Sequence, residues 1–177
     1  AGGPQVFGYF GQITPYKGVD ILLDAFTRLP AEIRQKCRLE VHGGGHHMFP
    51  GAFQNQIDDA ISRGPNEFVY AGPYEPADLV RRMSGVDWVI MPSIWWENSP
   101  LVIQEAFRHG RPVICSNIGG MAEKVTDEQN GLHFDVGNPN ALQAVMRRVI
   151  GDTSLLDRLR AGIESPPSIT ETVEHCL

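Results

Sequence analysis

The sequence predicts an α/β fold built on a doubly wound parallel sheet. Short runs rich in β-branched and aromatic residues alternate with longer amphipathic runs along the chain. No hairpin signal joins two of the strand-like runs, so each connection is expected to cross over through a helix on one face of the sheet. The 177 residues, 42% of them hydrophobic, suffice for one packed core.

Three strand and helix pairs are expected in the first half of the chain. The β-branched and aromatic runs 6–11, 38–43 and 68–72 predict strands. The amphipathic runs 19–29, 53–63 and 76–84 predict the helices that follow them. This order makes each helix the crossover between neighbouring strands.

The second half repeats the pattern. Strands are expected at 86–92, 112–116 and 132–135, and helices at 100–109, 121–126 and 141–150. Residues 152–162 predict a last helix, after which the sequence turns polar. The chain opens almost directly on a strand, so we expect residues 1–177 to be a single domain excised from a larger protein.

Composition excludes several classes of partner. Fifteen Lys and Arg against 21 Asp and Glu give a net charge of −6, the wrong sign for tracking a nucleic acid. The longest apolar runs fall far short of the roughly 20 residues that span a bilayer, and no secretory leader is visible. A cytoplasmic location is therefore expected, with Cys37, Cys115 and Cys176 as reduced thiols.

Ligands of open parallel sheets bind at the carboxyl ends of the strands. Three loops lie there: 11–18, 43–50 and 92–100. In the third, Ser99 is a predicted N-cap and Pro100 the first helical residue. Because no Glu or Gln at Val102 completes a capping box, the first-turn amides of Leu101 and Val102 can receive an anion.

Two carboxylates bracket this anion site. Glu97 lies in the loop before the helix and Glu105 in its second turn, with seven residues between them. Both can accept hydrogen bonds from neutral sugar hydroxyls. The alternative is structural: Glu105 pairs with Arg108 or His109, and Glu97 is solvated.

The remaining loops offer further candidates. Lys17, one of only three lysines, lies in the first loop and suits a phosphate; the alternative is an ordinary surface lysine. Residues 43–45 are glycines that permit close backbone approach to a ligand. The histidines His42, His46 and His47 suggest a metal, but no acidic residue or cysteine stands near them, so no metal site is expected.

Two further pairs allow more than one interpretation. Gly119 and Gly120 form either an amide nest beside the ligand or a tight turn. Trp95 and Trp96 either stack on a substrate ring or a partner domain, or lie buried under their loop.

Together these motifs resemble the retaining group 1 glycosyltransferases of the GT-B fold, in their Rossmann-like C-terminal, donor-binding half. The resemblance runs from about residue 6 to 152. The residues that carry it are the glycine loop 11–18, Pro92-Ser93, the Glu97 and Glu105 pair, the run 110–113, Gly119-Gly120 and 130–132.

The resemblance implies that this domain binds a nucleotide-diphosphate sugar and that an absent N-terminal domain holds the acceptor. Lys17 would then hold the diphosphate, Glu97 the transferred sugar and Glu105 the ribose, with Glu97 and Lys17 as the catalytic residues. The implied donor-binding set is Gly11, Gln12, Lys17, Gly43, Gly72, Glu97, Asn98, Ser99, Pro100, Leu101, Val102 and Glu105.

The same resemblance implies no cofactor and no divalent metal, because the family stabilises the leaving diphosphate electrostatically. It implies an acceptor sugar or lipid-linked glycan, as in cell-surface polysaccharide, lipopolysaccharide or glycoconjugate synthesis, and peripheral association of the full-length protein with the inner face of the membrane. One residue departs from the pattern: Gln12 stands where the family commonly has arginine.

Other functions stay open at this point. A dinucleotide-dependent oxidoreductase is disfavoured, because the first strand leads into Gly8-Tyr9-Phe10-Gly11 and no GxGxxG motif follows. A sugar epimerase shares the GT-B architecture. A nucleotide-sugar-binding module without turnover is the alternative that Gln12 favours. The isolated chain is expected to be inactive in transfer.

Overall fold

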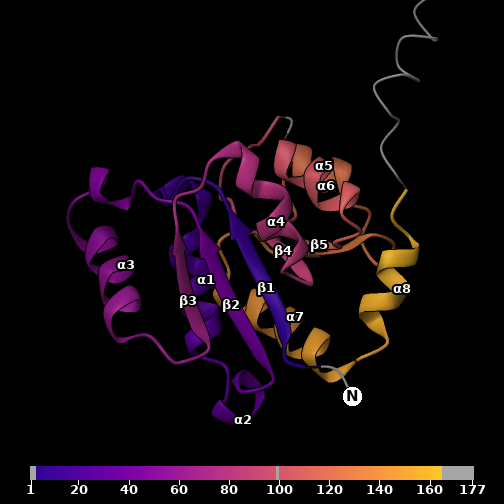
Figure 1. Ribbon diagram of the computed structural model, residues 1–177, viewed down its shortest axis with the longest axis horizontal. Coiled ribbons are helices and arrows are strands. Elements are labelled where there is room, and N and C mark those ends of the chain that lie inside the picture. The colour runs from indigo at the N-terminus through magenta and orange to yellow at the C-terminus, as the bar shows by residue number, and fades with distance from the viewer. Residues whose placement is uncertain (1–2, 99, 165–177) are drawn as a thin grey trace, which may run out of the picture.

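Six strands form one parallel sheet in the order β3-β2-β1-β4-β5-β6 (Figure 1). The computed structural model describes residues 3–98 and 100–164. The strands are β1 (Gln5–Phe10), β2 (Cys37–His42), β3 (Phe68–Gly72), β4 (Trp88–Met91), β5 (Val113–Ser116) and β6 (Gly131–Phe134). Every pairing between neighbours is parallel, which confirms the predicted doubly wound sheet.

Helices connect the strands as the sequence indicates. The α-helices are α1 (Val19–Thr27), α2 (Ala31–Arg34), α3 (Ala52–Arg63), α4 (Leu79–Ser84), α5 (Leu101–Arg108), α6 (Gly119–Lys124), α7 (Pro139–Gly151) and α8 (Leu155–Ala161). Three single 3₁₀ turns are η1 (Pro15–Lys17), η2 (His46–Met48) and η3 (Pro76–Asp78). The short helix α2 and the turns η1 and η2 had no counterpart among the predicted elements.

Several predicted boundaries were wrong for local reasons. Pro100, with extended backbone, is the N-cap of α5, so the helix begins one residue later than predicted; the predicted N-cap Ser99 lies outside the described residues. The helix expected at 76–84 opens as a 3₁₀ turn. The last helix begins at Leu155 because the Asp152 carboxylate accepts bonds from the Ser154 amide (3.1 Å) and hydroxyl (2.7 Å), which form a turn first.

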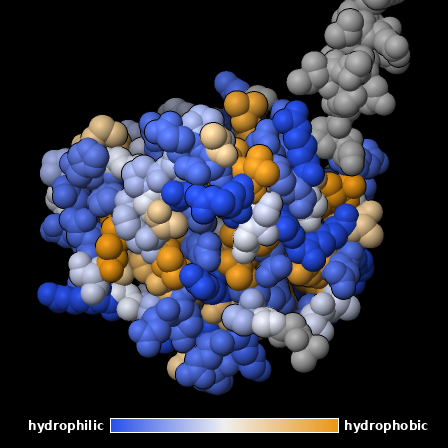
Figure 2. Space-filling model, viewed as in Figure 1, coloured by the Kyte–Doolittle hydropathy of each residue, from blue (hydrophilic) through white to orange (hydrophobic). Residues whose placement is uncertain are grey.

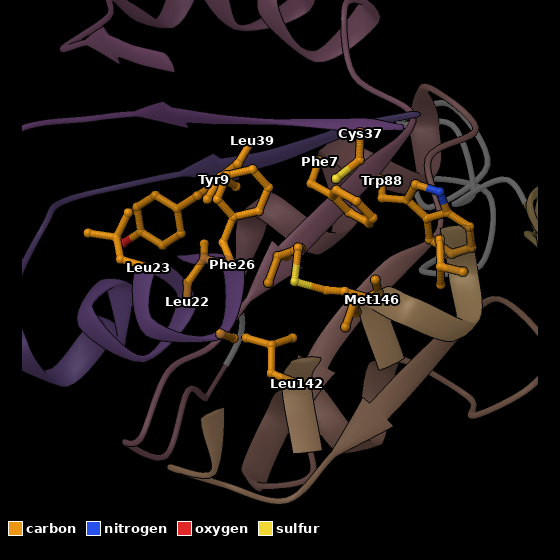
Figure 3. Close-up of a cluster of buried hydrophobic side chains, with 14 of the residues drawn as sticks. Phe7, Tyr9, Leu22, Leu23, Phe26, Cys37, Leu39, Trp88, Leu142 and Met146 are labelled. Carbon is orange, nitrogen blue, oxygen red and sulfur yellow. The ribbon is translucent and has the colours of Figure 1, made fainter. Parts of the chain in front are cut away.

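The two faces of the sheet bury separate hydrophobic clusters. One contains Phe7 and Trp88 with side chains from α1, α3, α7 and α8, and ten of its residues are labelled in Figure 3. The other contains Phe10 and Val89 with side chains from α4, α5 and α6. Because Phe7 and Phe10 leave β1 on opposite faces, both layers of helices are anchored to this central strand.

The outer surface carries mainly hydrophilic side chains. Figure 2 shows blue residues over most of one face, with orange hydrophobic residues in smaller groups between them. Within the described ranges, no helix has the length and apolarity needed to cross a membrane.

The strand order reverses at β1. The chain moves outward from β1 to β3 and then returns to place β4 on the other side of β1. Helices that follow β1 and β4 therefore leave the sheet on opposite faces and open a crevice between the carboxyl ends of these strands. The candidate site lies at this crevice.

Candidate functional site

The loops after β1 and β4 are in direct contact at the crevice. The Ile94 amide donates to the Tyr16 carbonyl at 3.0 Å. Gly18, at φ 71°, brings α1 so close that a Cβ atom there would lie 2.0 Å from the Pro92 carbonyl oxygen. Only glycine tolerates both the positive φ and this approach. Gly18, the last residue of the predicted first loop, is thus needed because the fourth loop packs directly against it.

The glycine loops after β1, β2 and β3 also touch one another. The Gly11 amide donates to the His42 carbonyl and the Gly43 amide to the Gly72 carbonyl, both at 3.0 Å. A Cβ atom on Gly43 would lie 1.7 Å from the Gly11 carbonyl oxygen. The lack of a side chain at Gly43 therefore makes room for the backbone of the neighbouring first loop.

Lys17 and Glu97, eighty residues apart in sequence, form an ion pair across the crevice. The Lys17 Nζ lies 2.5 Å from Glu97 Oε1, with 36% of the lysine and 19% of the glutamate side chain exposed. The buried Ser93 hydroxyl donates to the same carboxylate oxygen at 2.9 Å. Oε1 thus receives two donors, and among the described residues none donates to Oε2.

A cleft of about 340 Å³ surrounds this ion pair. Its lining includes these members of the predicted donor set: Gly11, Gln12, Lys17, Glu97, Pro100, Leu101 and Val102. Tyr9, Phe10, Met91, Pro92 and Ser93 complete it. The structure therefore brings together the first loop, the fourth loop and the first turn of α5.

The amino end of α5 lies at the cleft with its first-turn backbone donors. Leu101 and Val102 line the cleft, and no side chain of a described residue caps the helix. The first-turn N–H groups carry the positive end of the helix dipole. Because Lys17 lines the same cleft, the cleft presents two kinds of anion-binding group.

Gln12 is fixed through its backbone. The buried Tyr9 hydroxyl donates to the Gln12 carbonyl at 2.5 Å, and Tyr9 lines the cleft beneath it. Burial, followed by the neighbouring Tyr74 and Glu97, raises the pKa of Tyr9 well above its ordinary value. Tyr9 therefore stays a neutral donor that holds Gln12 in place, while the Gln12 side chain is exposed.

The glycine pair at the start of α6 supports the loop that carries Glu97. The Gly120 amide donates to the Glu97 carbonyl at 2.7 Å, and a Cβ on Gly120 would lie 2.3 Å from the same oxygen. The pair does not form a separate tight turn: both glycines belong to the first turn of α6, which packs against the fourth loop. The helix also begins at Gly119, two residues before the predicted start.

Glu105 lies on α5 outside this cleft lining. Its Oε1 accepts from Arg108 Nη1 at 2.8 Å, with 27% of the glutamate side chain exposed. The ion pair that the helical spacing allowed is therefore present in the structure. Gly43, Gly72 and Asn98 of the predicted set are also absent from the described cleft lining, and Gly43 lines the neighbouring cleft instead.

A second cleft adjoins the first, at the loop after β3. It has a volume of about 490 Å³ and is lined by Gly11, Gln12, the glycines 43–45, Pro73, Tyr74 and Pro76. Arg82 holds this loop, because its guanidinium donates to the carbonyls of Ala71, Gly72 and Pro73 at 3.0–3.1 Å.

Neither Tyr74 nor Arg82 was among the residues predicted from the sequence to lie at the site. The guanidinium carbon of Arg82 also lies 5.5 Å from the centroid of the Tyr74 ring. Arg82 stands in an ordinary amphipathic helix pattern, which gives no signal for a contact with a loop.

The histidines at the end of β2 have separate partners. His42 stacks on Phe10 with ring centroids 4.5 Å apart. The His42 Nε2 lies 3.2 Å from Glu40 Oε2, and the His46 Nε2 lies 3.2 Å from Asp58 Oδ1. The expectation that no acidic residue stands near these histidines was therefore wrong. Within the described residues, no three His, Cys, Asp or Glu side chains gather as metal ligands.

Comparison with known proteins decides the family. The chain matches the family of glycosyl transferases group 1 over residues 1–164. The chain belongs to this family. It is 32% identical over 161 residues to the D-inositol 3-phosphate glycosyltransferase of Jonesia denitrificans, covering 89% of this chain and 38% of that protein.

Other group 1 relatives differ in what they make. The chain is 30% identical to the glycogen synthase of Thermus thermophilus, covering 78% of this chain and 30% of the relative. It is 32% identical to the lipopolysaccharide 1,2-N-acetylglucosaminetransferase of Salmonella typhimurium, covering 71% of this chain and 34% of that relative. The chain thus spans less than half the length of these curated relatives.

Several solved structures share the fold of this domain. Anabaena HepE in complex with UDP-glucose superposes with a TM-score of 0.77 at 25% identity, covering 90% of this chain and 43% of HepE. The C-terminal domain of the Francisella tularensis protein LpcC superposes with a TM-score of 0.77 at 18% identity, covering 90% of this chain and 82% of that domain. The predicted Rossmann-like GT-B architecture is confirmed.

Proposed function

We propose that this domain binds a nucleotide-diphosphate sugar in the cleft between the loops after β1 and β4. The observation that supports this most directly is the meeting of Lys17, the amino end of α5 and Glu97 in one cleft at the point where the strand order reverses. Lys17 and the helix amides suit a diphosphate, and the Glu97 carboxylate suits sugar hydroxyls. HepE, a structural relative, has been crystallised with UDP and UDP-glucose.

The Lys17 and Glu97 ion pair is compatible with both roles at once. An ammonium has three donors, of which Glu97 Oε1 takes one, so two remain for phosphate oxygens. Ser93 and Lys17 together hold Oε1, which leaves Oε2 for a hydroxyl of the transferred sugar. We therefore assign the diphosphate to Lys17 and the sugar to Glu97, the two residues proposed to be catalytic.

A thermal-shift panel tests the proposed ligand class. UDP, GDP, ADP and dTDP sugars are each compared with the matching nucleoside. A ligand at 100 times its dissociation constant stabilises the fold by about 2.7 kcal/mol. We expect at least one nucleotide sugar to raise the melting temperature well beyond its nucleoside. No shift with any of them would overturn the proposal.

Glu105 is proposed to accept hydrogen bonds from the ribose. Its carboxylate would then leave or share Arg108, a surface ion pair that contributes little to stability. We expect Glu105→Gln to weaken nucleotide binding about tenfold to a hundredfold, the value of charge-assisted hydrogen bonds of roughly 1.5–3 kcal/mol. Isothermal titration calorimetry measures the change.

Arg108→Gln is the matched control for this variant. It breaks the same ion pair but keeps the carboxylate, so its nucleotide affinity should stay near that of the parent. Equal losses in the two variants would assign Glu105 a structural role only.

Donor binding is proposed to need no cofactor and no divalent metal. The charge of the diphosphate is offset by Lys17 and by the amides of the first turn of α5. We expect the dissociation constant measured in EDTA to match that measured in Mg²⁺. A large loss of affinity on chelation would contradict this assignment.

In the whole protein, we propose that the domain serves retaining transfer of a hexose to an acceptor sugar or lipid-linked glycan held mainly by an N-terminal domain. The relatives that make glycogen and lipopolysaccharide support this substrate class. A cytoplasmic site at the inner face of the membrane remains part of the proposal.

The chain of residues 1–177 alone is expected to bind donor without transferring it. The measurement is product formation from a radiolabelled nucleotide sugar and a glycan acceptor. Efficient transfer by this chain would show that the acceptor site is complete within it.

A further inference from the structure

A third opening beside the ion pair has aromatic walls. It has a volume of about 490 Å³ and is lined by Gln12, Thr14, Tyr16, Lys17, Trp95 and Glu97. Three of these residues, Gln12, Lys17 and Glu97, also line the donor cleft. A ligand in this opening would therefore lie directly beside the groups proposed to hold the diphosphate and the transferred sugar.

The aromatic pair is held in place although it is open to solvent. The Tyr16 and Trp95 rings meet edge to face, with centroids 5.9 Å apart and planes at 70°. The backbone bond from Ile94 to Tyr16 fixes the two loops next to these rings. Yet 56% of Tyr16 and 63% of Trp95 are exposed, so burial of this tryptophan under its loop was the wrong interpretation.

The adjacent Trp96 has different surroundings. It is similarly exposed, at 67%, but does not line the opening. Instead its ring lies over the start of α6, where a Cβ on Gly119 would be 3.0 Å from Trp96 Cε3. The two neighbouring tryptophans thus differ in environment, which makes each a control for the other.

We propose that Tyr16 and Trp95 form a subsite for a pyranose ring of the acceptor. This inference rests on the proposed donor site. A pyranose ring has an apolar C–H face that packs on aromatic rings and hydroxyls around its edge that need hydrogen-bond partners. The opening offers both, because Gln12, Thr14 and Glu97 line it together with the two rings.

A wholly apolar occupant fits the opening less well. It would remove water from the Lys17 ammonium and the Glu97 carboxylate without replacing their hydrogen bonds to solvent. The acceptor sugar also has a chemical reason to lie here, since its hydroxyl must reach the sugar carried by the donor. A subsite that shares Glu97 with the donor cleft meets that requirement.

Nuclear magnetic resonance of the indole N–H groups tests the subsite. The chain has three tryptophans, and the third, Trp88, is fully buried and serves as an internal reference. The ¹⁵N-labelled chain is saturated with the nucleotide sugar that binds best in the thermal-shift panel. Methyl glucopyranoside, mannopyranoside and galactopyranoside are then added in turn. We expect at least one to shift the Trp95 signal saturably and to leave Trp88 and Trp96 unmoved.

Two matched variants complete the test. Trp95→Ala should weaken pyranoside binding about tenfold, the loss of roughly 1.4 kcal/mol of stacking. Trp96→Ala should change it less than about twofold, or roughly 0.4 kcal/mol. The nucleotide affinity of each variant is measured separately by calorimetry, so failure of the donor site is seen independently of the pyranoside result.

Three outcomes would overturn the acceptor subsite. One is the absence of a saturable Trp95 shift with all three pyranosides. Another is an equal loss of binding in the two tryptophan variants. The third is pyranoside binding that occurs when only the nucleoside diphosphate is bound and is lost when the intact nucleotide sugar is bound, which would place the donor's own sugar on the rings.

Discussion

Lys17→Ala is expected to reduce nucleoside diphosphate affinity about a hundredfold, near the upper end of charge-assisted hydrogen bonds. The variant loses the phosphate contact and also leaves the Glu97 carboxylate without its cation. An unpaired carboxylate in the same cleft repels the incoming diphosphate. Affinity for the nucleoside alone should change little, because the ribose and base contacts lie elsewhere. Calorimetry with both ligands at two salt concentrations measures the difference.

Two further variants sharpen this test. Lys36→Ala removes an exposed lysine that precedes β2 at the opposite end of the sheet, and it should leave diphosphate affinity unchanged. Gln12→Arg in the Lys17→Ala background should recover part of the affinity. A guanidinium offers two parallel donors to phosphate, and Tyr9 keeps the residue 12 backbone in place. Equal losses for nucleoside and diphosphate would instead assign Lys17 to loop structure.

Gly18→Ala is expected to be the most destabilising of the substitutions considered. The new Cβ would meet the Pro92 carbonyl oxygen at 2.0 Å, and the backbone has φ 71°. Left-handed backbone costs a non-glycine residue about 1–2 kcal/mol, and overpacking adds about 1–3 kcal/mol. We expect the free energy of unfolding to fall by about 2–5 kcal/mol, measured by urea denaturation. Donor binding should weaken as well, because Lys17 precedes this glycine.

Gly110→Ala is the control that measures how much of this destabilisation comes from left-handed backbone alone. Gly110 has φ 65°, close to that of Gly18, but nothing lies within 4 Å of the position its Cβ would take. The free energy of unfolding of this variant should fall by only about 1–2 kcal/mol, and its donor affinity should be retained. If the two variants unfolded at the same urea concentration, the contact between α1 and the fourth loop would not be a significant constraint.

Much of the fold could be predicted from local patterns. Alternation of β-branched strands with amphipathic helices places all six strands within two residues of their observed ends. The boundaries that failed depend on contacts outside the pattern. Asp152 delays α8 through bonds to Ser154, and Gly119 joins α6 because Gly120 packs against the Glu97 carbonyl.

The sequence by itself determined the sheet, the loops at its carboxyl edge and the residue types that suit a nucleotide sugar. Only the tertiary structure decided that Lys17 and Glu97 pair with each other, and that Trp95 lines the opening beside them while Trp96 lies over α6. Periodicity reports how each segment packs on the sheet. It carries no information on which loops meet, because that depends on the strand order β3-β2-β1-β4 and on carbonyl positions next to glycines far away in sequence.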